Sequence, residues 1–341
     1  MVNPIYKSKL EFSPFMKYFC TKNCMLQLLQ YYKIQHAILY IKVGFNLEVI
    51  FSNSGFWVNS ADALTPSASN VFLSQGYSDS FDESCELNKQ QLLSGIPPIV
   101  LVDTYYLPYR KEYQKIHASH SAIFAGFDEN SVCLIDCYPP HYFKGFIKNE
   151  VYKESRNSIN PKDVNPFSGI PIMNYWYSID IDKLADSLND CISNTLSDVV
   201  KKTSDHEKIL RREDALTYLY TYFIMHKNNK ISDKKLIMRK LHDSLFVYQN
   251  ASNLMVYYFE TLKDLMRIPE EIMETLKKLN ECLTQFNVLC MRGSISQNPS
   301  YYDDVGKLFL ELIKNQAVYL KNMDIWLSSE LFTKNKLEGI C

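Results

Sequence analysis

The chain has 341 residues, with 37 lysines and arginines against 38 aspartates and glutamates, and 46% of its residues are hydrophobic. This near-neutral composition is typical of a folded, soluble protein, and it supplies no net charge that would attract nucleic acid or an anionic membrane. The N-terminal segment MVNPIYKSKLEFSPF lacks the apolar run of a secretory signal, and no segment has about 18 uninterrupted apolar residues. We therefore expect a cytoplasmic protein with neither nucleic acid nor membrane as a partner.

The first element that matters for chemistry is a helix within FCTKNCMLQLLQYY, residues 19–32. Cys24 and Leu28 recur at helical spacing, so Cys24 is expected to face the core. Cys20 lies one turn earlier, at the helix start, where the free N–H groups and the helix dipole favour a thiolate. Cys20 is therefore a candidate nucleophile, although both thiols could serve only as core packing.

The chain up to residue 180 mixes short apolar strands with turns. A buried strand is predicted within 97–107, and two strands at 121–127 and 131–136 flank the polar turn DENS as an antiparallel hairpin. A loop-rich stretch follows, marked by Pro139, Pro140, Pro161, Pro166 and Pro171.

From about residue 181 the apolar positions recur every three or four residues, which predicts a bundle of helices. The predicted helices lie at 182–200, 213–227, 233–266 with a break near Asn250, 269–291 and 301–331. The sequence thus predicts an α+β fold with two domains, a catalytic domain over 1–180 and an all-α domain over 181–341.

A cysteine nucleophile needs a base and a group that orients the base. His120 opens the first strand of the predicted hairpin and Asp136 ends the second, so the two ends should return beside each other. This arrangement would make His120 the base and Asp136 its orienting carboxylate. A histidine that is only hydrogen-bonded to a turn aspartate is the structural alternative.

Four residues near this hairpin are candidates for substrate binding. Asp103 ends the predicted buried strand and is followed by two aromatic residues, Tyr105 and Tyr106, which together could line a pocket and attract an amine. The same aspartate could instead cap the turn. His117, in the loop before His120, could bind an acceptor or could be a plain loop histidine.

A zinc site is the competing use of the same side chains. Cys20, Cys24, His117 and His120 provide four nitrogen and sulfur ligands, but neither pair has the usual C-x2-C knuckle spacing. The sequence also has no P-loop, no GxGxxG and no HExxH. We therefore expect no bound metal and no cofactor.

Two segments resemble known cysteine enzymes. CTKNCMLQLLQYY resembles the nucleophile segment of bacteriocin-processing cysteine peptidases, and HSAIFAGFDENSVCLID is similar to their histidine strand, with Gly126 six residues after His120. A fuller resemblance, over about residues 10–150, is to the N-terminal domain of the butirosin-biosynthesis protein H family. It also includes SGIPPIVLVDTYYLPY, and the closthioamide-type amide ligase is a related branch.

The resemblance implies a papain-like fold with Cys20 as nucleophile, His120 as base and Asp136 as orienting carboxylate. It further implies an acyltransferase of antibiotic biosynthesis that moves an acyl group to a small amine by way of an acyl-Cys intermediate. The donor would be a thioester on the phosphopantetheine arm of an acyl or peptidyl carrier protein.

One departure from the peptidases concerns the oxyanion donor. The peptidases have a glutamine a few residues before the cysteine, where this chain offers only Ser13, Lys17 or Tyr18. The side-chain donor is thus unassigned, which weakens the case for a peptidase.

Three functions follow from these residues: the acyltransferase, a peptidase or amidase with water as acceptor, and a non-catalytic zinc- or partner-binding module. An acidic carrier protein could dock on one of three basic clusters, Lys201–Lys202, Arg211–Arg212 or Lys234–Lys235.

Overall fold

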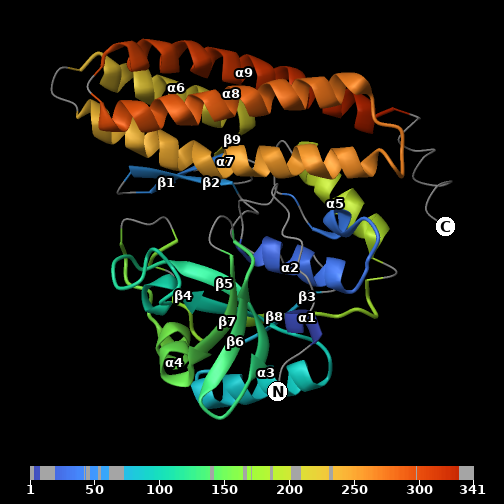
Figure 1. Ribbon diagram of the computed structural model, residues 1–341. Coiled ribbons are helices and arrows are strands. Elements are labelled where there is room, and N and C mark those ends of the chain that lie inside the picture. The colour runs from blue at the N-terminus through green and yellow to red at the C-terminus, as the bar shows by residue number, and fades with distance from the viewer. Residues whose placement is uncertain are drawn as a thin grey trace. The chain divides into compact units, whose positions relative to one another are not determined.

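The computed structural model describes residues 4–7, 20–41, 43, 47–52, 55–60, 73–138, 142–163, 167–169, 171–184, 187–200, 209–229, 233–296 and 298–329 (Figure 1). The chain divides into two compact units. The sheet unit comprises Met1–Ile41 and Ala68–Leu188, and the helical unit comprises Lys42–Ser67 and Asn189–Cys341. The chain combines helices with sheets whose strands pair in antiparallel fashion, so the predicted α+β class is confirmed.

The sheet unit is built on a six-stranded antiparallel sheet with strand order β3-β8-β4-β5-β6-β7. Its strands are β3 (Leu73–Gly76), β4 (Ile99–Asp103), β5 (Ser119–Phe127), β6 (Ser131–Asp136), β7 (Phe143–Lys148) and β8 (Trp176–Ile179). The predicted hairpin is therefore present as β5 and β6, and β4 occupies the predicted buried strand.

Helices cover both faces of this sheet because its side chains alternate between two apolar surfaces. Ala122 and Phe124 of β5 point into a core that includes Leu92 of α3 (Phe81–Leu93) and Tyr152 of α4 (Asn149–Asn157). Ser121, on the opposite face, contacts α2 (Cys20–Tyr31). The remaining short helices of this unit are α1 (Pro4–Lys7), η1 (Ala37–Tyr40) and η2 (Thr104–Tyr106).

The predicted helices are all present, and their ends lie within about six residues of the expected positions. They are α5 (Leu188–Val200), α6 (Arg212–Lys227), α7 (Lys234–Leu262), α8 (Glu270–Ile295) and α9 (Ser300–Leu327). The break predicted near Asn250 is wrong, because α7 runs through it without interruption. Asn250 is buried between the apolar positions Tyr248 and Leu254, so the packed face of the helix continues across it.

The division of the chain at residue 180 differs from the observed units in one respect. The hairpin of β1 (Leu47–Ser52) and β2 (Gly55–Ser60) groups with the helices, because β1 also pairs with β9 (Ile209–Arg211). A salt bridge of 2.7 Å between Glu48 and Arg211 joins the same two strands. The helical unit is therefore not all-α, and the sheet unit is not one continuous stretch of chain.

The stretch predicted to be loop-rich after Pro140 contains regular structure, namely β7 and α4. Arg156 explains why α4 is held in place. Its buried guanidinium donates hydrogen bonds to the Leu101 carbonyl at 2.8 Å, to the Ser84 hydroxyl at 2.9 Å and to the carbonyls of Asn174 and Tyr175. Burial lowers the pKa of Arg156 from its ordinary value. One side chain thus joins α3, α4, β4 and the approach to β8.

None of the helices in the described part of the chain combines the length and the apolar character that a bilayer crossing requires.

Replacing Arg156 with methionine should destabilise the sheet unit by about 3 kcal/mol, because several buried carbonyls would lose their donor. Urea unfolding of the full chain measures the change in the free energy of unfolding. Lys153→Met, at an exposed position on the same helix, is the matched control and should change the value by less than about 0.5 kcal/mol. Equal effects of the two substitutions would contradict the role given to Arg156.

Candidate active site

Cys20 lies in the first turn of α2, and contacts to β5 fix the position of that helix. The Thr21 hydroxyl is 2.6 Å from the Ser121 hydroxyl, and the Cys24 thiol donates to the Ser121 carbonyl at 3.7 Å. Cys24 is fully buried, whereas Cys20 is partly exposed. The helix phase predicted from the sequence is therefore confirmed, and only the first of the two thiols faces the outside of the core.

The sheet register brings His120 beside Asp136. Ile123 pairs with Ile135 in the β5–β6 ladder, so the residue opposite Asp136 is two positions after His120. His120 is thus a diagonal neighbour of Asp136, and its Nε2 lies 2.8 Å from Asp136 Oδ2. This bond leaves Nδ1 of the imidazole for Cys20, with which His120 also shares a hydrogen bond.

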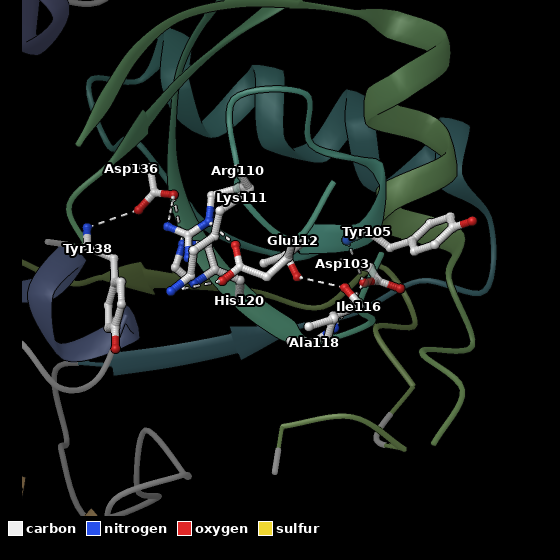
Figure 2. A network of polar contacts seen from close by, with 11 residues as sticks. Asp103, Tyr105, Arg110, Lys111, Glu112, Ile116, Ala118, His120, Asp136 and Tyr138 are labelled. Carbon is white, nitrogen blue, oxygen red and sulfur yellow. Dashed lines mark hydrogen bonds and ion pairs between the residues drawn. The ribbon is translucent and has the colours of Figure 1, made fainter. Parts of the chain in front are cut away.

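Two groups that sequence reasoning missed hold the Asp136 carboxylate (Figure 2). The backbone N–H of Tyr138 donates to Oδ1 at 2.9 Å, and Nη1 of Arg110 donates to Oδ2 at 3.3 Å. Asp136 is completely buried, so these donors replace the water that its charge has lost. Arg110 lies in the irregular segment between β4 and β5, where no periodic pattern marks it. Its one signal is a charged run, RKE, within an aromatic stretch.

Cys20, His120 and Asp136 shift one another's pKa values. The loss of hydration raises the pKa of Cys20, but the charge of His120 and hydrogen bonds from His120 and Ser121 outweigh it, so the pKa is below the ordinary thiol value. Burial lowers the pKa of His120, but the charges of Asp136 and Cys20 raise it further, to about 9. A lowered pKa makes the thiolate of Cys20 more accessible, and the protonated imidazole beside it can act as an acid.

The raised pKa of His120 also links the site to stability. An unfolded histidine titrates near 6.5, so the stabilisation from the protonated imidazole is fully present below about pH 6.5. It is lost as the pH rises through about 9, where His120 releases its proton.

Cys20 differs from the other thiols of the described residues. Burial, followed by the contact with the Cys137 thiol, raises the pKa of Cys24 well above its usual value. Burial also raises the pKa of Cys85, Cys133, Cys282 and Cys290. Among the described thiols with a shifted pKa, only Cys20 is shifted toward the thiolate.

Asp103 occupies the turn-capping position that was the alternative to a substrate-binding role. Oδ1 accepts hydrogen bonds from the N–H groups of Tyr105 and Ala118, at 3.0 and 3.2 Å. Oδ2 accepts the Ser158 hydroxyl at 2.5 Å and lies 2.7 Å from His117 Nδ1. Both oxygens of this buried carboxylate therefore have partners within the fold, and a role for Asp103 in holding an amine stays a prediction.

The other predicted substrate-binding residues gather around the same carboxylate. The ring of Tyr105 stacks on the His117 imidazole with centroids 4.1 Å apart, and Tyr106 approaches it edge-on at 6.2 Å. All three are partly exposed. In Figure 2, Asp103 and Tyr105 lie at the opposite end of the polar network from Asp136 and Tyr138. A role for His117, Tyr105 and Tyr106 in substrate binding stays a prediction.

The potential zinc ligands are committed to other partners. His117 is bonded to Asp103, His120 to Asp136, and Cys24 to the Ser121 carbonyl. Within the ranges that the structure describes, no group of three or more histidine, cysteine, aspartate or glutamate side chains could hold a metal ion.

The possible oxyanion donors Ser13, Lys17 and Tyr18 lie outside the described residues, as do Lys201 and Lys202. Two further basic residues have partners within the fold. Arg211 pairs with Glu48, and buried Arg212 donates to the Val199 carbonyl at 2.5 Å. Of the three basic clusters, Lys234–Lys235 at the start of α7 remains available among the described residues.

Part of this site lies in a segment that matches a known protein family. Residues 75–137 match the family model described as Butirosin biosynthesis protein H, N-terminal. This match confirms the resemblance to the butirosin-biosynthesis protein H N-terminal family. It spans β3 to β6 and includes His120 and Asp136, while Cys20 precedes it. No curated protein matches the chain.

Iodoacetamide should alkylate Cys20 rapidly at pH 7, and His120→Gln should slow this reaction about tenfold or more, because each unit of thiol pKa changes the thiolate fraction tenfold. The measurement is peptide mapping by mass spectrometry in a Cys341→Ser background. This background removes the one cysteine outside the described residues. Cys24→Ala is the matched control and should leave the rate at Cys20 unchanged. Faster alkylation of another cysteine in the wild-type chain would contradict the assignment.

Proposed function

We propose that this protein is a cysteine-dependent acyltransferase with a papain-like catalytic unit, and that it forms amide bonds in antibiotic biosynthesis. The single observation that carries the proposal is the partly exposed Cys20 thiol beside the His120 imidazole, which the buried Asp136 carboxylate holds at 2.8 Å. The family match supports the biosynthetic setting, since its description refers to butirosin biosynthesis.

The first half-reaction loads the enzyme. The Cys20 thiolate attacks the carbonyl carbon of an acyl thioester, a new C–S bond forms, and the thiolate of the donor leaves. The His120 imidazolium supplies the proton that the leaving thiolate takes up. The products are an acyl-Cys20 enzyme with a neutral His120 and a free donor thiol.

The second half-reaction unloads it. A neutral amine attacks the acyl carbon, the C–S bond breaks, and an amide forms. His120 takes the proton that the amine nitrogen loses, which restores the imidazolium beside the Cys20 thiolate. Asp136 stabilises the imidazolium and keeps its orientation in both steps. Electrons and protons balance without any cofactor.

We further propose that the thioester is carried on the phosphopantetheine arm of an acyl or peptidyl carrier protein in the cytoplasm. Such carriers are commonly acidic, and exposed Lys234 with its neighbour Lys235 offers a positive charge for docking. A small amine is the expected acceptor.

Incubation with an acyl N-acetylcysteamine thioester should give a mass increase of one acyl group that maps to Cys20. Addition of a small diamine should then release the acyl group as an amide. Cys20→Ala should form no adduct, and His120→Ala should slow turnover by a factor of about 100 or more. Above pH 9 turnover should fall, because His120 loses the proton that the leaving thiolate requires.

Cys24→Ala is the matched control and should load normally. Release of the free acid at the same rate with and without amine would replace the proposal with a peptidase or amidase. An adduct confined to Cys24, or no adduct together with amide formation by Cys20→Ala, would refute it.

A further inference from the structure

The Asp136 carboxylate is linked to a second buried carboxylate through one guanidinium. Nη1 of Arg110 donates to Asp136 Oδ2 at 3.3 Å, and its Nε donates to Glu112 Oε2 at 3.2 Å. The side chain of Arg110 is 5% exposed and that of Glu112 is 10% exposed. Figure 2 shows Arg110 beside Asp136, with Glu112 farther along the same network.

These contacts create an alternating series of charges. Glu112 is negative, Arg110 positive, Asp136 negative, His120 positive and the Cys20 thiolate negative. A buried charge is costly without a partner, and here each charge inside the series has an opposite charge on either side. The anion at the outer end, Glu112, leaves the set with a net charge of −1.

We propose that Arg110 and Glu112 are positioning residues that fix the Asp136 carboxylate and set the charge felt by the Cys20–His120 pair. The functional machinery then comprises five charged groups instead of three. The proposal rests on the acyltransferase assignment for its catalytic meaning, although the charge network can be tested without any acyl donor.

The geometry explains why an arginine suits this position. Its planar guanidinium presents separate N–H groups to two carboxylates at once, which a lysine ammonium on a flexible stem does not do with fixed orientation. The ring of Tyr138 lies 5.5 Å from the guanidinium carbon and limits its movement. The carboxylate of Asp136 is then held on both oxygens, by Tyr138 N–H on one and by Arg110 and His120 on the other.

Tyrosine and cysteine side chains from other elements also lie near the pair. The ring of Tyr138 meets the His120 imidazole edge-on at 5.7 Å. Burial raises the pKa of Tyr109, which is close to Asp136, well above its usual value, and raises the pKa of Tyr177, which is close to Cys20, to about 12. Burial and the hydrogen-bond contact with the free Cys137 thiol raise the pKa of Cys24.

The two residues should therefore act on the pair with opposite signs. Removing the Arg110 cation favours the protonated forms of both His120 and Cys20, so both pKa values should rise. Removing the Glu112 anion leaves the Arg110 cation unbalanced and favours the deprotonated forms, so both pKa values should fall. A merely structural role would lower stability in both variants without this reversal of sign.

The experiment measures the rate of Cys20 alkylation by iodoacetamide as a function of pH, in the Cys341→Ser background. The midpoint is the pH at which the alkylation rate of Cys20 is half of its maximum. Relative to the Cys341→Ser protein, Arg110→Met should raise this midpoint by about 0.5–1 pH unit, and Glu112→Gln should lower it by a similar amount. The double variant should return to within about 0.3 pH unit of the starting protein, since the charges are removed as a pair.

Lys111→Met is the matched control. Its ammonium lies 4.0 Å from Glu112 but is 70% exposed, so solvent screens it and the midpoint should not move. Thermal melting identifies variants that have not folded. If Arg110→Met does not fold, the shift of Glu112→Gln alone decides the sign, and Arg110→Lys should keep a midpoint close to that of the starting protein.

Shifts in the same direction, or no shift in folded variants, would overturn the inference. If Cys20 forms an acyl-enzyme but the midpoints do not change, the charge-network proposal is refuted and the acyltransferase proposal is not. Opposite shifts without any acylation of Cys20 would support the network and refute the acyltransferase.

Discussion

The position of β5 in the middle of the sheet is the constraint on which the site depends. β5 pairs with β4 on one side and β6 on the other, packs against the apolar core through Ala122 and Phe124, and contacts α2 through Ser121. These contacts fix the register of β5, because a shift of one residue would turn each of its side chains to the opposite face of the sheet. The fixed register places His120 diagonally across from Asp136 and holds the start of α2 nearby.

Burial strengthens the electrostatic interactions among these groups, but it also removes the water that would otherwise stabilise their charges. A carboxylate that is completely buried needs donors, and Tyr138 N–H, Arg110 and His120 supply them. The same charge keeps His120 protonated well above the pH at which a free histidine titrates, and the imidazolium in turn favours the Cys20 thiolate. Each ionised group is thus stabilised by its neighbour, so the site is best understood as one electrostatic unit.

A second buried carboxylate on the same sheet shows how context separates two similar pairs. Asp103 and His117 are as close as Asp136 and His120, at 2.7 and 2.8 Å. Asp103, however, has both oxygens filled by backbone N–H groups, Ser158 and His117, and caps the turn after β4. The pair around Asp103 therefore serves the local fold, while His120 is the one that shares a hydrogen bond with a thiol.

Local patterns in the sequence determined the elements and the identity of the reacting groups. Helical periodicity placed Cys20 at a helix start and Cys24 in the core, and the short turn between two apolar runs placed His120 near Asp136, because these features depend on neighbours within one element or one hairpin. Contacts between distant segments were decided by the tertiary structure alone. Arg110 and Glu112 lie in irregular chain, the strand pair β1–β9 joins residues about 160 positions apart, and Asp103 meets Ser158 only after folding. No local period encodes such contacts, since they arise from the packing of elements that the sequence keeps far apart.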